Sequence, residues 1–450
     1  MGILKVTGRI ITIALLLVTA MEGSSLAFHS GGVGQCEGCH SMHNSFGGSA
    51  NVSGRPFGAG AGAYLLKAND SSGVCLNCHE GADVAPNGYH VSTSGVYPYD
   101  GTTPVEMTPG GDFAWLKKTM NMTIGGTAVP DGNVGQRHGH NIVAYDFGYY
   151  EDTRLSMAPG GTYPSNALGC QSCHDPHGRY RRFADGSYST SGLPTYGSGS
   201  YSGGDSPVAG VAAVGSYRML AGINYQPKSL AGSFAFVNNP PDAAVSTDYN
   251  RSEANSQTGI AYGRGMSEWC VNCHTDMLLG AYSTGHSVAE MQSHPVGNSA
   301  KLTAGVVTIY NSYVSSGVMT NTNPAAAFSN ITPFEIGTND YSALRGYAVT
   351  SASYTDQSMP AASVNNNVMC LTCHRAHASG FDNALRWSNL STFLTIADAS
   401  GNAVYDTSIT DSTNNRGYSP EQQQNAYNGR PATVFGPYQR SYCDKCHATN

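Results

Sequence analysis

The stretch that decides the fold of this chain is Cys370-Leu371-Thr372-Cys373-His374, one of six copies of the pattern Cys-x-x-Cys-His. The other copies are Cys36-Glu37-Gly38-Cys39-His40, Cys75-Leu76-Asn77-Cys78-His79, Cys170-Gln171-Ser172-Cys173-His174, Cys270-Val271-Asn272-Cys273-His274 and Cys443-Asp444-Lys445-Cys446-His447. In this pattern the two thiols can bond to one porphyrin while the adjoining histidine binds its iron, which is the attachment signature of c-type haem. The sequence therefore predicts six covalent haems, with proximal ligands His40, His79, His174, His274, His374 and His447.

Other uses of paired cysteines fit this pattern less well. Disulfides, zinc ribbons and redox Cys-x-x-Cys pairs do not require a histidine directly after every second cysteine. The six motifs also account for all 12 cysteines, so none is left for a separate disulfide network.

Nine histidines lie outside the motifs, which is more than the six needed to give every iron a second histidine. Methionine is the competing axial ligand, but scattered methionines more often fill apolar gaps. His138 and His286 are expected on the surface or behind a ligand. Seven candidates remain for six distal positions: His29, His43, His90, His140, His177, His294 and His377. The sequence does not decide whether His29, His90 or another member of this set is surplus.

Three of these candidates, His43, His177 and His377, follow a motif histidine by three residues. In a helical stretch, residues i and i+3 lie on the same face. Such a histidine would stay on the side of the ring that the proximal ligand already occupies. We therefore expect each of the three to ligate a different haem, the alternative being a hydrogen bond to a propionate.

The composition is poor in the residues that usually fill a core. Leu, Ile, Val and Phe make up 77 of the 450 residues, too few for side-chain cores of ordinary density. Charged residues are 12% of the chain and the formal net charge is −7, which disfavours both charge-driven disorder and nucleic-acid binding. Porphyrins would supply the missing apolar interior. The expected fold class is a multihaem cytochrome c: mostly irregular coil with short α-helices and few short β-strands, wrapped round a linear array of six haems.

Regular secondary structure is expected only in short pieces. Helices are expected at 112–119, 268–279, 285–293, 371–378, 383–396 and 420–427, while 302–317 could be a helix or a strand. The first cysteines of successive motifs are 39, 95, 100, 100 and 73 residues apart, which is too uneven for a tandem repeat.

Residues 1–27 are expected to be a secretory signal peptide. Lys5 and Arg9 give a positive start, an apolar run of 11 residues follows at 10–20, and Ser25-Leu26-Ala27 is a small-x-small cleavage site. The alternative, an N-terminal membrane anchor, would need about 20 apolar residues. Residues 28–450 are then expected to form a single hexahaem domain with no later transmembrane span.

Several stretches resemble one known family. They are Phe28-His29-Ser30-Gly31-Gly32, Met107-Thr108-Pro109-Gly110-Gly111-Asp112-Phe113, Tyr225-Gln226-Pro227-Lys228-Ser229-Leu230, Gly265-Met266-Ser267-Glu268-Trp269 and Pro437-Tyr438-Gln439-Arg440. With the six motifs, they make the whole mature chain similar to the outer-surface hexahaem c-type cytochromes of metal-reducing bacteria, the OmcS type. The resemblance implies bis-histidine haems and subunits that polymerise end to end into conducting filaments. It also implies that His43 ligates the haem attached at Cys370 and Cys373 of the neighbouring subunit.

The expected function is electron transfer by an exported protein at the outer surface of the cell. Electrons would pass along closely spaced haems to metal oxides, electrodes, partner cells or other multihaem cytochromes, without bond-making catalysis. One alternative is a multihaem reductase of the nitrite or hydroxylamine type, with one open haem. The other is a monomeric periplasmic electron shuttle with the same ligation.

Overall fold

The computed structural model describes residues 36–40, 45–46, 49–50, 65–82, 90–93, 104–106, 108–118, 121–124, 127–130, 138–177, 180–183, 187–189, 214–244, 257–258, 260–278, 294–316, 333–347, 350–351, 362–389, 392–406, 420–427 and 431–447. The expected signal peptide, the histidines His29, His43 and His286, and the expected helix 285–293 lie outside the described residues.

The helices are short, as the sequence predicts. They are α2 (Cys36–Cys39), α3 (Ser71–His79), α4 (Met266–Cys270), α5 (Ala304–Ser316), α6 (Tyr341–Tyr347), α7 (Cys370–Cys373) and α8 (Pro420–Ala426). The undecided stretch 302–317 is helical as α5, and the prediction at 420–427 is confirmed by α8. The prediction of a helix at 383–396 is wrong: this stretch begins in the 3-10 turn η12 (Asp382–Ala384) and ends in strand β12 (Thr395–Ala397).

The strands are mostly two residues long and all of their pairings are antiparallel. They are β1 (Ser45–Phe46), β2 (Ser49–Ala50), β3 (Asn121–Ile124), β4 (Thr127–Pro130), β5 (Arg181–Arg182), β6 (Tyr188–Ser189), β7 (Val214–Gly215), β8 (Ala243–Ala244), β9 (Gln257–Thr258), β10 (Ala261–Tyr262), β11 (Thr350–Ser351), β12 and β13 (Ala403–Tyr405). Among the described residues, the largest sheet has three strands, in the order β6-β5-β7. The mostly irregular fold class is confirmed.

Aromatic rings dominate the buried side chains. The largest cluster includes Trp115, Tyr149, Phe381, Trp387, Tyr405, Tyr427, Phe435 and Tyr442. Tyr405 and Tyr427 stack at 5.3 Å, and Trp387 lies 5.3 Å from Tyr442, which directly precedes motif 6. Rings of this size bury much apolar surface with few residues, so they suit a chain that is poor in aliphatics.

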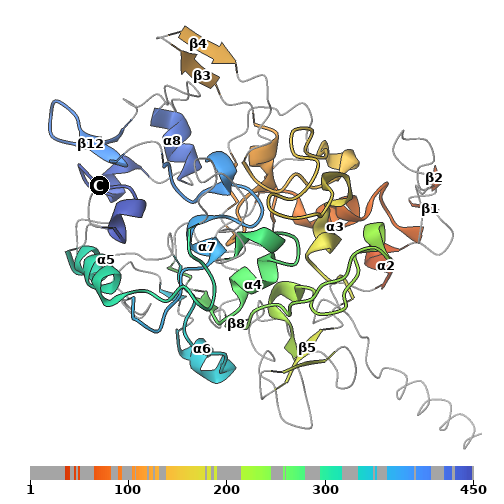
Figure 1. The fold of residues 1–450 in the computed structure, drawn as a ribbon. Coiled ribbons are helices and arrows are strands. Elements are labelled where there is room, and N and C mark those ends of the chain that lie inside the picture. The colour runs from red at the N-terminus through yellow and green to blue at the C-terminus, as the bar shows by residue number, and fades with distance from the viewer. Residues whose placement is uncertain are drawn as a thin grey trace, which may run out of the picture.

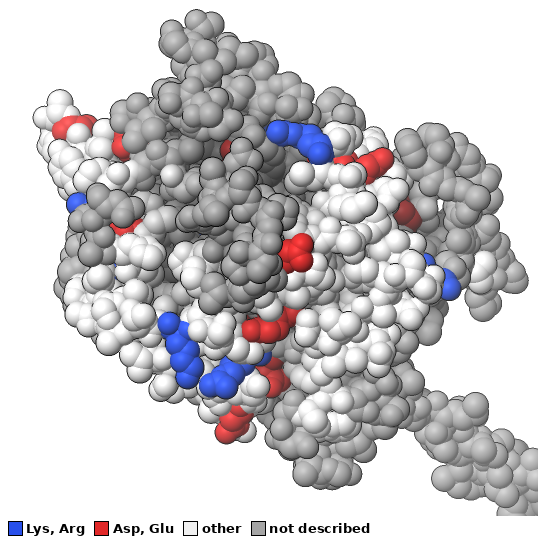
Figure 2. Space-filling view, in the orientation of Figure 1, with Lys and Arg blue, Asp and Glu red and all other residues white. Residues whose placement is uncertain are grey.

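In Figure 1, α2 lies on one side of the body, α4 and α7 lie near its middle, and the C-terminus lies on the opposite side. On the face in Figure 2, charged side chains are sparse among the described residues, and several of both signs gather near the lower centre. Among the described residues, no helix has the length and apolar character needed to cross a membrane.

A local backbone pattern recurs at the odd-numbered motifs, counting the motifs 1 to 6 in chain order. In motif 3, Leu220 bridges the motif histidine and the next residue donates its N–H to Cys173 O at 2.9 Å. In motif 5, Leu385 bridges the motif histidine and the next residue donates to Cys373 O at 2.8 Å. Leu66 and Lys67 do the same for motif 1, at 2.9 Å.

The residue just before each of these leucines has a positive φ: 57° at Leu65, 55° at Met219 and 54° at Ala384. L-amino acids with side chains rarely adopt such angles, so three occurrences at one relative position indicate a common structural requirement. The uneven spacing of the motifs therefore conceals a local repeat, because loops of different length separate its parts.

Candidate haem-binding site

Successive motifs along the sequence are neighbours in space. The pKa of the Cys75 thiol is raised most by a hydrogen bond to Cys170, then by burial, and also by the nearby thiols Cys170 and Cys39. Motif 2 thus adjoins motifs 3 and 1. Burial raises the pKa of Cys273, and the nearby Cys173 adds to that shift, so motif 4 adjoins motif 3.

The second half of the array continues in the same order. The pKa of Cys270 is raised most by a hydrogen bond to Cys370, which joins motifs 4 and 5. Burial raises the pKa of Cys373 to about 12, with smaller contributions from Cys443 and Cys446, which joins motifs 5 and 6. The sequence could not order the motifs in space; the structure orders them from 1 to 6.

Two kinds of contact alternate along this order. Pairs 2–3 and 4–5 meet at their first cysteines, and α3 packs on the 3-10 turn η6 (Cys170–Ser172) as α4 packs on α7. Pair 3–4 instead meets through its second cysteines, and in pair 5–6 the second cysteine of motif 5, Cys373, lies near both cysteines of motif 6.

Three motif histidines face a histidine from another part of the chain. The ring centres are 6.5 Å apart for His174 and His377, 6.0 Å for His274 and His140, and 5.9 Å for His447 and His294. Two imidazoles on one metal ion each place a nitrogen about 2 Å from it, which separates the ring centres by roughly 6 Å. Each pair therefore leaves room for one iron between its rings.

Backbone carbonyls select the nitrogen that would face each iron. Nδ1 of His174, His274 and His374 donates to Arg218 O, Pro159 O and Asn383 O at 2.7–2.8 Å. A carbonyl can only accept, so Nδ1 carries the proton and Nε2 keeps its lone pair for a metal.

The same argument holds for two distal candidates. Nδ1 of His140 donates to Ala376 O at 2.6 Å, and Nδ1 of His294 donates to Pro295 O at 2.8 Å. Burial lowers the pKa of His274 to about 4 and of His377 to about 3, with nearby histidines adding to both shifts. Both rings are therefore neutral at pH 7, as metal ligands must be.

Two of the distal candidates lie on adjacent segments that pair with each other. The His140 N–H donates to His377 O at 2.9 Å, and the His377 N–H donates to Gly110 O at 2.8 Å. Gly139 and Gly111 both form bridges with Ala378. These three segments, 109–113, 138–142 and 375–379, form what we call the ligand plate. It aims His140 at the motif 4 histidine and His377 at the motif 3 histidine.

The helical premise for the histidine three residues after a motif is wrong for motif 5, and the stretch that carries His43 lies outside the described residues. Helix α7 ends at Cys373, and His374 is already extended, with φ −111° and ψ 157°. His377 nevertheless lies against the histidine of motif 3 rather than its own, because the ligand plate carries it there. His177 is exposed at the end of a described segment.

His90 lies close to motif 2. Val91 donates its N–H to His79 O at 2.8 Å, and a Cβ added to Gly81 would lie 3.2 Å from His90 Nε2. His90 is thus held close to the proximal histidine of motif 2.

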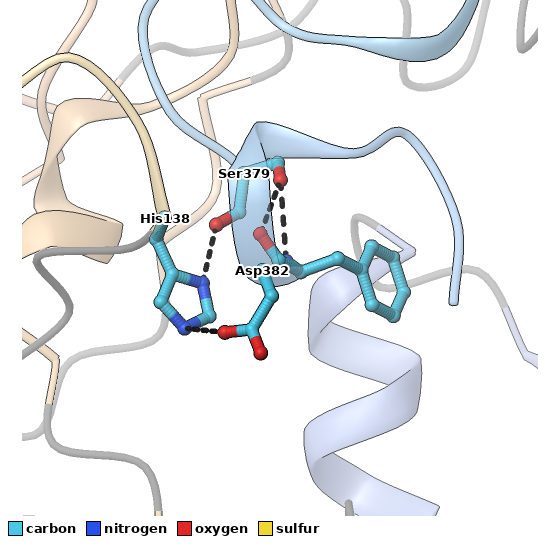
Figure 3. A network of polar contacts seen from close by, with 4 residues as sticks. His138, Ser379 and Asp382 are labelled. Carbon is cyan, nitrogen blue, oxygen red and sulfur yellow. Dashed lines mark hydrogen bonds and ion pairs between the residues drawn. The ribbon is translucent and has the colours of Figure 1, made fainter. Parts of the chain in front are cut away.

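His138 lies two residues from His140 but has both of its nitrogens engaged. Figure 3 shows its ring between Ser379 and Asp382, with Nδ1 2.9 Å from Ser379 O and Nε2 3.6 Å from Asp382 Oδ1. The ring is 4% exposed. His138 therefore ties the ligand plate to the turn η12 and has no free nitrogen directed at an iron.

The donor set fits c-type haem. Paired thiols for the porphyrin and two imidazoles whose ring centres are 5.9–6.5 Å apart, the separation that one shared iron requires, occur together at motifs 3, 4 and 6. Residues of these motifs would hold the porphyrin, and the two histidines of each pair would hold its iron.

Comparison with known proteins agrees with this donor set. No protein-family model matches the chain. The C-type cytochrome OmcS of Geobacter sulfurreducens is 50% identical over 437 residues, covering 97% of this chain and 96% of that protein. A cryo-EM structure of OmcS nanowires from Geobacter sulfurreducens matches with a TM-score of 0.78 at 50% identity, over 94% of this chain and 100% of that one. An Outer Membrane Cytochrome S filament from the same organism matches with the same score and coverage at 49% identity. This chain belongs to the OmcS family of c-type cytochromes.

Proposed function

We propose that this chain is an exported hexahaem electron carrier that polymerises head to tail into conductive filaments outside the cell. The nanowire and filament forms of its relatives support this assembly. Residues 1–27 would be removed on export and residues 28–450 would form one hexahaem body. Its partners would be further copies of itself, other multihaem cytochromes and extracellular electron acceptors.

The observation that carries this proposal is the pairing of histidines along an ordered row of motifs. The pairs His174–His377, His274–His140 and His447–His294 are assigned to haems 3, 4 and 6. Haem bound at these places supplies an iron that changes between ferric and ferrous states. If two histidines hold each iron, as these pairs would, no place would remain for a substrate, and the protein would carry electrons without catalysing bond making.

The local repeat at the odd motifs extends this assignment. His377, three residues after motif 5, pairs with the histidine of motif 3, one odd motif earlier. If each such histidine ligates the haem of the preceding odd motif, His177 after motif 3 would ligate haem 1. His43 after motif 1 would then have to reach an odd motif that precedes motif 1, and only another copy of the chain could supply one. Motif 5 of that copy, with Cys370 and Cys373, is the expected haem.

A second step assigns haem 2. His140, the partner of motif 4, precedes motif 3, and His294, the partner of motif 6, precedes motif 5. The partner of motif 2 would therefore precede motif 1, where His29 is the candidate. His90 would then be the surplus histidine.

Replacing His43 by alanine tests the assembly directly. The H43A protein should retain six covalent haems but form no filaments in electron micrographs, and one haem should give a high-spin ferric signal. H90A is the matched control and should keep both the filaments and six low-spin haems. Normal filaments from H43A, or a high-spin haem in H90A alone, would overturn the assignment.

A further inference from the structure

Two serines occupy the same place before motifs 2 and 4. Ser72 and Ser267 each lie three residues before the first cysteine of their motif. Each hydroxyl accepts a hydrogen bond from the backbone N–H of the first cysteine of the next motif: Cys170 N to Ser72 Oγ, and Cys370 N to Ser267 Oγ, both at 3.1 Å. The partners are 98 and 103 residues apart in the sequence, so both bonds are tertiary contacts.

These bonds satisfy donors that the local sequence cannot satisfy. The first N–H groups of a helical turn have no partner within the turn and usually bond to a side chain at the N-cap. The N-cap residues here are Gly169 and Met369, which have no side-chain oxygen. Ser72 and Ser267, which are 1% and 0% exposed, supply the missing acceptors from the preceding motif.

Both serines also touch a haem-attachment sulfur. Each hydroxyl lies within hydrogen-bond reach of the side chain of the same cysteine, Cys170 for Ser72 and Cys370 for Ser267. One side chain thus contacts the backbone and the sulfur of the next motif's first cysteine. This contact occurs at the two junctions where first cysteines meet, 2–3 and 4–5.

We propose that Ser72 and Ser267 are positioning residues that set the separation and register of the two haem-attachment sites at junctions 2–3 and 4–5. The proposal rests on the proposed function, since it concerns the haems that these motifs would hold. Without the serine, the two motifs would stay attached to their own haems but would lose the bond that holds one attachment site at a fixed distance from the other.

The test uses the full-length haem-loaded protein and its circular dichroism in the Soret band, where closely spaced haems give an exciton couplet. S72A and S267A should each lose part of the couplet amplitude. The double variant should lose the sum of the two parts, because the two junctions share no partner. S92A is the matched control: Ser92 is buried and its backbone pairs with Glu80 just after motif 2, but its hydroxyl bonds to Tyr149 Oη at 2.5 Å, so its variant should keep the couplet.

A second variant breaks the first bridge from the opposite side while keeping Ser72. A Cβ on Gly169 would lie 2.6 Å from Ser72 Oγ, so G169A should reproduce the S72A spectrum. G305A, in α5, is its control, because the nearest atom to its Cβ would be 3.9 Å away. An unchanged couplet in S72A and G169A would overturn the proposal, as would loss of covalent haem from both variants, which would indicate a role in folding alone.

Haem content and electron micrographs of the same samples separate this test from the proposed function. If the wild-type protein holds six haems but forms no filaments, the assembly proposal fails and the couplet still tests the serines. If it forms filaments and the couplet survives in both variants, the serine proposal alone fails.

Discussion

A histidine can bind iron only through a nitrogen whose lone pair is free, and in this chain the backbone decides which nitrogen that is. His140 donates Nδ1–H to Ala376 O and keeps Nε2 available. His138, two residues earlier, spends one nitrogen on Ser379 O and holds the other beside Asp382. Of these two histidines on one short segment, His140 is thus a ligand candidate, whereas His138 holds two segments together.

This difference predicts opposite outcomes for two neighbouring substitutions. H140A should give one high-spin haem in the ferric electron paramagnetic resonance spectrum, because haem 4 loses its second histidine. H138F should leave all haems low-spin and lower the free energy of unfolding by about 1–3 kcal/mol, the cost of leaving buried polar partners unsatisfied. A high-spin signal from H138F would show that His138 is itself a ligand.

Glu335 is a buried acid whose side chain contacts Met266, the first residue of α4. Its carboxylate accepts the Met266 N–H at 2.8 Å, and its side chain is fully buried. Burial, and then the charge of Glu268, raises the pKa of Glu335 from 4.5 to about 7. The folded protein therefore holds this proton more tightly than the unfolded chain does.

The sign of the resulting pH dependence follows from that raised pKa. The contribution of Glu335 to stability is present below about pH 4.5 and is lost as the pH rises through about 7, amounting to about 3 kcal/mol at most. The E335Q protein, whose amide stays neutral and can still accept the Met266 N–H, should lack this loss. Denaturant unfolding of both haem-loaded proteins at about pH 5 and about pH 8 checks the difference. If the free energy of unfolding changed by the same amount between these pH values in both proteins, the prediction would be contradicted.

At the scale of elements, the ligand plate joins consecutive haem sites through backbone pairing. Its segment 375–379 follows motif 5 directly and carries His377 to motif 3, while the paired segment carries His140 to motif 4. The close approach of these segments depends on glycine. A Cβ on Gly139 would overlap the carbonyl oxygen of His377 and contact Ala378.

The plate predicts that G139A disturbs two ligands at once. Separation of the segments should cost about 1–3 kcal/mol of stability and should give high-spin signals from haems 3 and 4 together. Thermal unfolding and electron paramagnetic resonance of the haem-loaded protein measure both effects. The control G305A lies in the first turn of helix α5, where the nearest atom to its Cβ would be 3.9 Å away, and should lose no stability.

The predicted helices are confirmed where the local sequence pattern alone decides the secondary structure. Helix α8 matches the expected 420–427, whereas the expected helix 383–396 is a turn followed by a strand. In that stretch Asn383 and Ala384 take positive φ so that Asn383 O can accept from His374 Nδ1. The hydrogen bond from His374 therefore outweighs the local helical tendency of this stretch. The sequence of the stretch alone does not reveal that bond, because its donor lies in another segment.

At the scale of the whole molecule, the scarcity of aliphatic residues predicts that the chain does not fold without haem. Metal binding and folding are coupled when a site supplies much of the interior. Chain produced without haem attachment should show far-UV circular dichroism of an unfolded polypeptide and rapid proteolysis, whereas the haem-loaded protein should resist both. A cooperative thermal transition in the haem-free chain would contradict this expectation.

The local sequence predicts the chemistry of this protein: the haem-attachment motifs, their proximal histidines, the short elements and the pool of distal histidines. These follow from covalent and compositional patterns that lie within a few residues of each other. Only the tertiary structure decided that the motifs follow one another in space, that His377 faces motif 3, that His140 faces motif 4, and that His138 is engaged elsewhere. The physical reason is that a distal ligand comes from a segment many residues away, and its direction is set by backbone pairing such as that of the ligand plate, which no local pattern encodes.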